Sequence, residues 1–168
     1  MGQLKSKEEV MSFLGIPAAS ATKQGSFANN QGFTSRKPAI SFEGAFCINY
    51  YFAPKFAPAG DITMYYWNQA DFDAAKALSK DNATKAITMT PCDNGEYMAV
   101  VDGIAAKDLD SGIYVAFCYS DGTTDYCSGI IGYSIGAYCK NQASKTGTLA
   151  ELAAGTAVYG YYAKQLFG

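Results

Sequence analysis

Histidine is absent from all 168 residues of this chain. Imidazole is the base of Ser-His-Asp and Cys-His sites and a common metal ligand, so those sites are excluded. Paired carboxylates of the glycosidase type remain available. The candidate aspartates, however, lie at predicted turns and helix starts, where Asp has a structural role. We therefore predict that the protein is not an enzyme, and that it has no catalytic residue and no cofactor.

The five cysteines form no Cys-x-x-Cys pair and are odd in number: Cys47, Cys92, Cys118, Cys127 and Cys139. Structural zinc sites use closely spaced ligand pairs, so no metal site is predicted from them. We expect mostly free thiols that pack as small apolar residues, in keeping with folding in a reducing cytoplasm. Cys118 and Cys127 fall on one face of a predicted hairpin, so they could come close. Whether they are bonded stays open.

A possible calcium-binding motif lacks two of the ligands that it needs. Asp108-x-Asp110-x-Gly112 resembles the start of a calcium loop. It lacks a third acidic ligand, and Tyr119 stands where the loop requires its final glutamate. The sequence therefore predicts no calcium site.

Aromatic residues offer the one candidate for ligand contact. Tyr65 and Trp67 share one face of a predicted strand and could form a platform for a sugar or a protein. Aromatic side chains also favour strands and commonly pack in cores, which is the preferred interpretation. Both interpretations stay open at this point.

Charge argues against two further classes. The net charge is −2, and Arg36 is the only arginine among 13 basic residues, so nucleic-acid binding is not expected. No apolar run approaches the roughly 18 residues that a membrane-spanning helix needs, so no membrane insertion is predicted. Residues 1–37 also show no basic stretch followed by an apolar one, so no secretory signal is expected.

The predicted domains are an N-terminal segment, 1–37, and a body, 38–168. Ser6-Lys7-Glu8-Glu9 is a capping box for a short helix whose apolar stripe includes Phe13 and Leu14. An extended arm follows from Ala18 to Lys37 and carries Phe27 and Phe33. The arm is either a flexible linker or a set of aromatic anchors for a partner. The candidate assembly anchors are thus Phe13, Leu14, Phe27 and Phe33.

Alternation of period two dominates the body, which predicts β-strands. Strands are expected over 46–52, 62–67, 86–90, 96–101, 113–119 and 125–131. Asn94-Gly95 and Asp121-Gly122 predict tight hairpins between four of them. Asp71 is expected to cap a short helix that runs to Leu78.

The end of the chain is predicted to be helical. A short helix is expected from Ser134 to Asn141, and Thr148-x-x-Glu151 caps a longer one. Gly155 and Gly160 would each cost this helix about 1 kcal/mol relative to Ala. We expect both to be compensated by close approach of the helix to the sheet.

The fold class predicted is mainly β, an antiparallel β-sandwich with a short N-terminal helix, an extended arm and a C-terminal helix. Asp110-Ser-Gly-Ile-Tyr114 resembles the tyrosine corner of immunoglobulin-type domains, which makes the sandwich immunoglobulin-like. Ala116 stands where those domains carry a disulfide cysteine, so the likeness is architectural.

A wider resemblance rests on Ile40–Gly44 with Cys47–Phe52, on Gly103–Lys107, and on the closing Tyr159–Ala163. Over about residues 39–167 the chain resembles a C-terminal β-sandwich module of large cell-surface proteins of gut Firmicutes. The resemblance implies no catalytic residue. Because no export signal is seen, we predict a non-catalytic structural or display protein of a phage particle, with the module borrowed from such a host.

This interpretation also predicts the partners of the protein and its location. The partners expected are other virion proteins and further copies of the chain in a homo-oligomer. The protein would be made in the host cytoplasm and reside in the virion as a capsid decoration, collar or fibre module. The alternative is an adhesion or carbohydrate-binding module of the bacterial cell surface. Contact with a host surface or a glycan is compatible with both.

Overall fold

The computed structural model describes residues 25, 27, 32–35, 38–41, 46–136, 138–139 and 148–167. The predicted N-terminal helix, with Phe13 and Leu14, lies outside these residues. So does most of the predicted arm.

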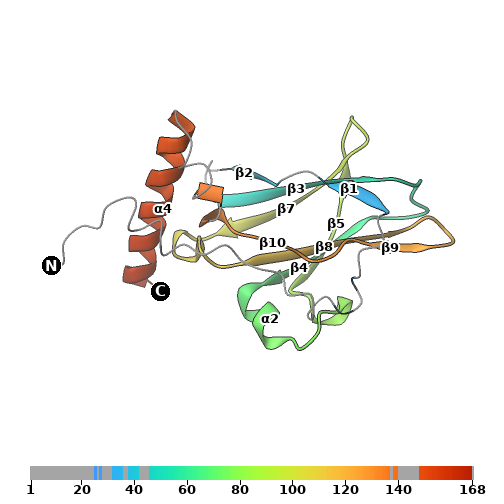
Figure 1. Cartoon of the computed structure of the whole chain (residues 1–168), viewed down its shortest axis with the longest axis horizontal. Helices are drawn as coiled ribbons and strands as arrows, with labels where there is room; N and C mark the ends of the chain where they lie inside the picture. The colour runs from blue at the N-terminus through green and yellow to red at the C-terminus, as the bar shows by residue number, and fades with distance from the viewer. Residues whose placement is uncertain are drawn as a thin grey trace.

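Two antiparallel sheets face each other (Figure 1). The first, sheet A, has the strand order β1-β3-β7-β6, with β2 also paired to β3. Its strands are β1 (Phe33–Ser35), β2 (Ala39–Ser41), β3 (Phe46–Pro54), β6 (Thr90–Pro91) and β7 (Tyr97–Ile104). The predicted fold class, a mainly β antiparallel sandwich with a C-terminal helix, is confirmed.

The second, sheet B, has the order β10-β8-β4-β5, with β9 also paired to β8. Its strands are β4 (Thr63–Asn68), β5 (Lys85–Thr88), β8 (Ile113–Ser120), β9 (Asp125–Cys127) and β10 (Ile131–Tyr133). The predicted strand 86–90 is in fact two strands, because β5 pairs in sheet B and β6 in sheet A. Both predicted hairpins form, as β6–β7 and β8–β9.

Strand β8 is buried on both of its faces. Alternate side chains enter the core between the sheets, namely Ile113, Val115, Phe117 and Tyr119. The others enter a second cluster on the outer side of sheet B, namely Tyr114, Ala116 and Cys118. A strand with two buried faces reads as a continuous apolar run, as β8 does.

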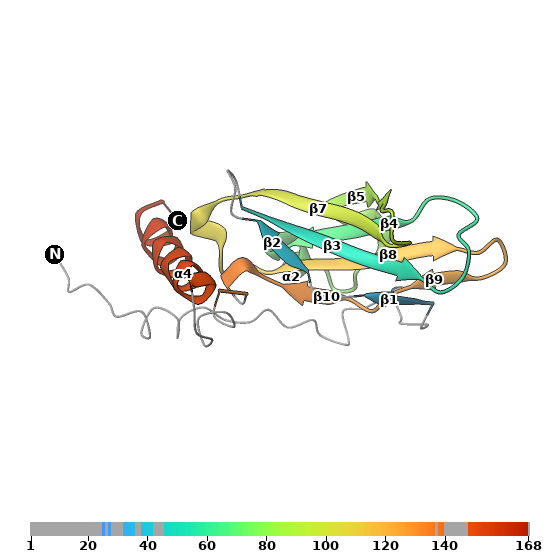
Figure 2. The same cartoon turned by 90° about the horizontal axis from the view of Figure 1, so that it is seen from above.

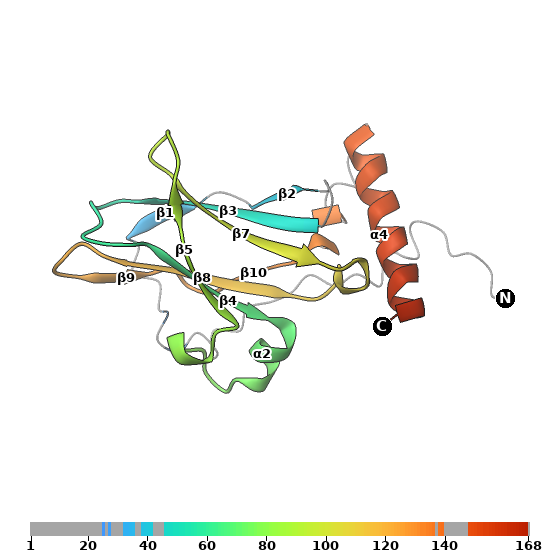
Figure 3. The same cartoon turned by 180° about the vertical axis from the view of Figure 1, so that it is seen from behind.

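The outer side of sheet B is covered by the chain between β4 and β5. Helix α2 (Gln69–Ala74) and the 3-10 turn η2 (Lys80–Asn82) lie on this side, away from sheet A (Figures 1 and 3). The rings of Phe72 and Tyr114 stack at 3.6 Å between centroids. The start predicted for this helix was wrong: Asn68 is the cap and accepts from the Asp71 N–H at 2.8 Å. The helix also ends at Ala74, short of Leu78.

Part of the predicted arm packs on the sandwich. Residues 33–35 form β1, which pairs with the C-terminal half of β3. The Gly32 carbonyl accepts from the Lys55 N–H at 2.9 Å and from the Tyr119 hydroxyl. A Cβ at Gly32 would lie 2.3 Å from the Tyr126 ring, so only glycine fits there. The sandwich therefore includes residues 32–35, which lie before the predicted domain boundary at residue 38.

The C-terminal helix α4 (Thr148–Phe167) crosses one end of the sandwich (Figures 1 and 2). It packs against the 3-10 turn η3 (Ala106–Asp108), which follows β7. At Gly160 an added Cβ would lie 2.3 Å from Leu109 Cδ1 and 3.0 Å from the Ala106 carbonyl oxygen. At Gly155 it would meet nothing within 4 Å. Gly160 thus does lie at a close approach, but to η3 and Leu109 and not to the sheet as predicted, and at Gly155 the prediction is wrong.

These two glycines make a matched pair for mutation. Gly155→Ala should raise the free energy of unfolding by up to about 1 kcal/mol, because Ala favours helix and meets no obstacle. Gly160→Ala should lower it by about 1–3 kcal/mol, because the added methyl group must displace Leu109. Urea unfolding followed by circular dichroism measures both. Equal shifts of the same sign in the two variants would contradict this packing of α4.

Candidate functional site

A cleft of about 570 Å³ opens at the end of the sandwich where β4 passes into α2. One wall comes from residues 66–73 and the other from residues 102–113, two stretches far apart in the sequence. The lining is mixed, with apolar positions such as Ile104 and Ile113 among the polar side chains of Asn68, Gln69, Asp73, Asp102, Asp108 and Ser111. Clefts of this size commonly hold small ligands.

The first wall is held by the cap of α2. The Asn68 side chain accepts from the Asp71 N–H, while the Asn68 N–H donates to Thr84 Oγ1 at 2.9 Å. The Thr84 hydroxyl in turn donates to Asp71 Oδ2 at 2.5 Å. Asn is a favoured cap because its side-chain oxygen satisfies an amide that the first turn leaves unpaired. The junction between β4 and α2 is therefore rigid.

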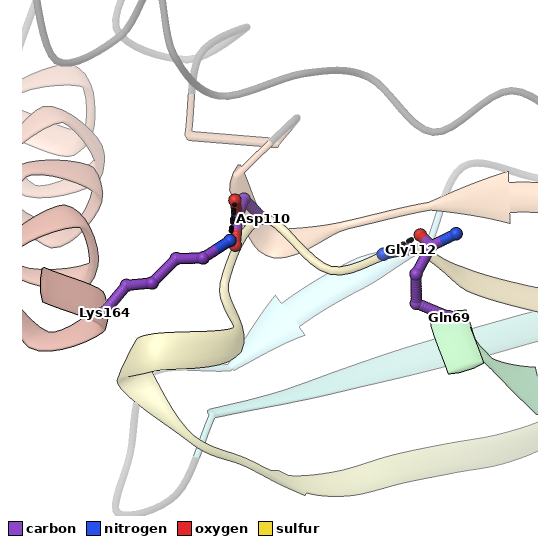
Figure 4. A network of polar contacts seen from close by, with 4 residues as sticks. All are labelled: Gln69, Asp110, Gly112 and Lys164. Atoms are coloured by element: carbon purple, nitrogen blue, oxygen red, sulfur yellow. Dashed lines mark hydrogen bonds and ion pairs between the residues drawn. The ribbon is translucent and has the colours of Figure 1, made fainter. Parts of the chain in front are cut away.

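Gln69 joins the two walls. Its Oε1 accepts from the Gly112 N–H at 2.9 Å (Figure 4), and its Nε2 donates to Asp73 Oδ1 at 2.9 Å. A Cβ at Gly112 would lie 2.5 Å from that Oε1 and 2.8 Å from the Tyr114 hydroxyl oxygen. A larger residue at position 112 would therefore displace the Gln69 amide, whose hydrogen bond fixes the backbone before β8 to α2.

The loop before β8 is also tied to α4. Lys164 Nζ lies 2.7 Å from Asp110 Oδ2 (Figure 4). Half of the Lys164 side chain is exposed, so this pair adds at most about 1 kcal/mol. Asp110, which belongs to the motif that resembles the start of a calcium loop, is thus paired with the Lys164 ammonium group. Within the described residues, no group of three or more Cys, Asp or Glu side chains is placed to hold a metal ion.

The cleft is acidic. Asp73, Asp102 and Asp108 are exposed, and no lysine or arginine is among its lining residues. On the wall, burial and the nearby Asp71 carboxylate raise the pKa of Tyr66. Its hydroxyl is protonated at neutral pH even without this shift, so it can donate a hydrogen bond. Such a surface suits ligands that donate hydrogen bonds or carry positive charge, and it disfavours anions.

The predicted aromatic platform does not form. Tyr65 and Trp67 do share a face, but this face of sheet B is the covered one. Trp67 is completely buried, and its Nε1 donates to Asn82 Oδ1 at 2.9 Å. Phe27 packs edge-on against it at 5.1 Å between centroids. Trp67 therefore has no surface to offer a ligand, which corrects that prediction.

Phe27, predicted to be an assembly anchor, is itself completely buried in this outer cluster. Its ring lies 5.6 Å from that of Tyr65, so it anchors residue 27 to the chain's own sandwich and not to a partner. Phe33 belongs to β1. Sequence reasoning missed the cleft residues because no motif links 66–73 with 102–113. The nearest signals were Asn68 at a strand end and Gly112 before β8.

In the part of the chain that the structure describes, every helix is too short or too polar to cross a membrane.

Trp67→Ala tests the burial of the predicted ligand contact. The substitution should lower the free energy of unfolding by about 3–5 kcal/mol, because it leaves a large cavity in the outer cluster. Tyr65→Ala, a half-buried residue on the same strand face, is the matched control and should cost clearly less. Equilibrium urea unfolding gives both values. If Trp67→Ala were as stable as the wild type, the indole would not be a core residue.

No family model and no curated protein matches this chain. A solved structure described as "Crystal structure of Br derivative BhCBM56" is similar at 17% sequence identity and a TM-score of 0.41. The match covers 60% of this chain and 97% of that chain. A TM-score this low does not establish a shared fold, so the fold and the site stand on the geometry given above.

Proposed function

We propose that this protein is a non-catalytic binding module whose acidic cleft holds a neutral carbohydrate. The observation that carries the proposal is the lining of the cleft, where carboxylates and amides meet one tyrosine and no basic residue. Sugar hydroxyl groups are hydrogen-bond donors as well as acceptors, and carboxylates accept from them strongly.

The geometry supports binding by a preformed site. Gln69 and Asn68 already hold the two walls through hydrogen bonds, so little ordering is needed when a ligand enters. Asp102 and Asp108 are exposed on the opposite wall, where their carboxylates are accessible to hydroxyl groups. The half-buried Tyr66 adds an apolar surface for a sugar ring.

Binding without hydrolysis fits the same residues. A glycosidase needs one carboxyl group in an apolar setting as a general acid and a second as a base or nucleophile. Asp73, Asp102 and Asp108 are all exposed to solvent. The three carboxyl groups of the cleft are therefore solvent-exposed hydrogen-bond acceptors, and none of them is enclosed in an apolar setting.

A glycan array with the whole chain, followed by calorimetry on the hits, tests this function. Asp102→Ala and Asp108→Ala should each weaken binding about tenfold or more, because each removes a charged hydrogen bond of about 1.5–3 kcal/mol. Asp93→Ala, in the β6–β7 turn outside the cleft, is the matched control and should bind as the wild type does. Absence of any glycan hit, or equal loss in all three variants, would contradict the proposal.

A second proposal is self-assembly of the chain into a multi-subunit particle such as the virion expected from the sequence, and the surface of α4 supports the self-assembly alone. Tyr159, Leu166 and Phe167 are exposed there at 62%, 77% and 74%. Clustered apolar side chains of this size mark contact surfaces. We propose that a second copy of the chain covers them and that the sandwich projects from the assembly. The bacterial cell surface is the alternative place for the same arrangement.

Sedimentation of the purified chain tests the assembly. Leu166→Lys and Phe167→Lys should shift an oligomer to monomer, because a buried lysine at the contact is costly. Gln165→Lys adds the same charge to an exposed position of the same helix and should leave the oligomer intact. A wild-type chain that stays monomeric at high concentration would contradict this use of α4. Mass spectrometry of purified particles then distinguishes a virion from a cell envelope.

A further inference from the structure

The strongest unassigned feature is a pair of thiols on neighbouring strands. Cys118 in β8 and Cys127 in β9 are direct cross-strand partners, as the sequence predicted that they could be. All five cysteines are thiols in this structure. Cys118 is buried, whereas Cys127 is only half-buried and is reached from solvent.

The hydrogen bonds around the pair show that it can be bridged. The Ser128 N–H donates to the Phe117 carbonyl at 2.9 Å, and the Asp121 N–H donates to the Thr124 carbonyl at 3.2 Å. Since paired and unpaired positions alternate along antiparallel strands, Cys118 and Cys127 form a non-hydrogen-bonded pair. Such pairs place their Cα atoms about 4.5 Å apart, within the range of about 4.4–6.8 Å found in disulfides.

The pair lies in its own pocket of about 190 Å³, away from the acidic cleft. Lys80 of η2, Tyr65 of β4 and Asp125 of β9 line it together with both cysteines. The Lys80 ammonium also lies 5.7 Å from the centre of the Tyr65 ring. A solvent-reached thiol beside a lysine is the environment of reactive cysteines.

The two thiols differ in proton affinity. A hydrogen bond from Cys118, followed by the Lys80 charge, lowers the pKa of Cys127 against the opposing effects of burial and Asp125. Cys118 keeps the shared proton, and this hydrogen bond together with burial raises the pKa of its thiol. In contrast, Cys139 is buried, which raises the pKa of its thiol to about 12 and keeps it inert.

We propose that Cys127 is a thiol-modification site that reacts with small disulfides and that Cys118 resolves the product. The Cys127 thiolate attacks one sulfur of a low-molecular-weight disulfide, whose S–S bond breaks and releases one thiolate. Cys118 then loses its proton to solvent and attacks the Cys127 sulfur, which releases the second thiolate. Two protein thiols are oxidised to one cross-strand disulfide, and the small disulfide is reduced to two thiols.

The hairpin keeps the two sulfurs opposite each other. Asp121 Oδ1 accepts from the Thr123 and Thr124 N–H groups at 2.9 and 2.7 Å, which fixes the turn between β8 and β9. Strand β9 has three residues and pairs only with β8 among the described strands, so it can shift to close the bond. Only a short hairpin loop separates the two cysteines, so Cys118 should attack the mixed disulfide on Cys127 without unfolding of the sandwich.

The test is incubation of the whole chain with oxidised glutathione, alkylation of the remaining thiols and peptide mass spectrometry. The wild type should yield a Cys118–Cys127 disulfide with little mixed disulfide. Cys118→Ser should stop at a glutathione adduct on Cys127, and Cys127→Ser should leave Cys118 unmodified. Cys92→Ser, at the other hairpin, is the matched control and should behave as the wild type does.

Lys80→Gln adds a readout that a merely structural thiol pair would not change. The side chain is exposed, so the fold should be kept, and the adduct on Cys127 should form several-fold more slowly in the Cys118→Ser background. Modification of Cys47 or Cys92 ahead of Cys127 would overturn the proposal. So would a wild-type chain whose Cys118 and Cys127 are both fully alkylated after oxidation. Unfolding curves of each variant confirm that it is folded when it is tested.

Discussion

Burial of β8 on both faces is the constraint on which the rest of this structure depends. Sheet A covers one face of β8. On the other face, Tyr114, Ala116 and Cys118 form a second apolar surface. A sheet face of this kind must be covered by another layer. The chain supplies that layer with α2, η2 and Phe27, and Trp67 fills the space between them. The Trp67–Asn82 hydrogen bond satisfies the one polar group of the indole.

Both candidate sites are consequences of this outer layer. At one end, α2 must begin where β4 leaves the sheet, and its cap places Asn68 and Gln69 beside the loop that leads into β8. At the other end, η2 brings Lys80 over the hairpin that carries Cys118 and Cys127. Polar groups are thus exposed at the edges of an apolar layer. The C-terminal helix adds a third surface, held close by Gly160 and by the Lys164–Asp110 pair.

Several features could be predicted because they depend on neighbours in the sequence. Alternation located β3, β4, β7 and β8, and Asn94-Gly95 and Asp121-Gly122 located the turns. The predicted strand 125–131 is in fact two strands, because β9 and β10 pair with different parts of β8. The Asp121-Gly122 turn also set the register that brings Cys118 and Cys127 opposite each other. A hairpin has few ways to close, so a short turn determines its register. The division of 86–90 between two sheets was missed, because the sequence pattern shows no break where the chain passes from sheet B to sheet A at Met89.

The sequence by itself therefore determined local structure: the positions of the longer strands, the hairpin registers, the fold class and the absence of imidazole chemistry. Only the tertiary structure decided which aromatic residues face solvent. Tyr65 and Trp67 share a face by periodicity, yet Phe27, some forty residues earlier, closes over it. The same holds for Gly155 and Gly160, which differ only in what lies opposite them. The acidic cleft joins two distant stretches through Gln69 and Gly112. Burial and contact between distant segments arise from packing in three dimensions, which spacing along one chain does not encode.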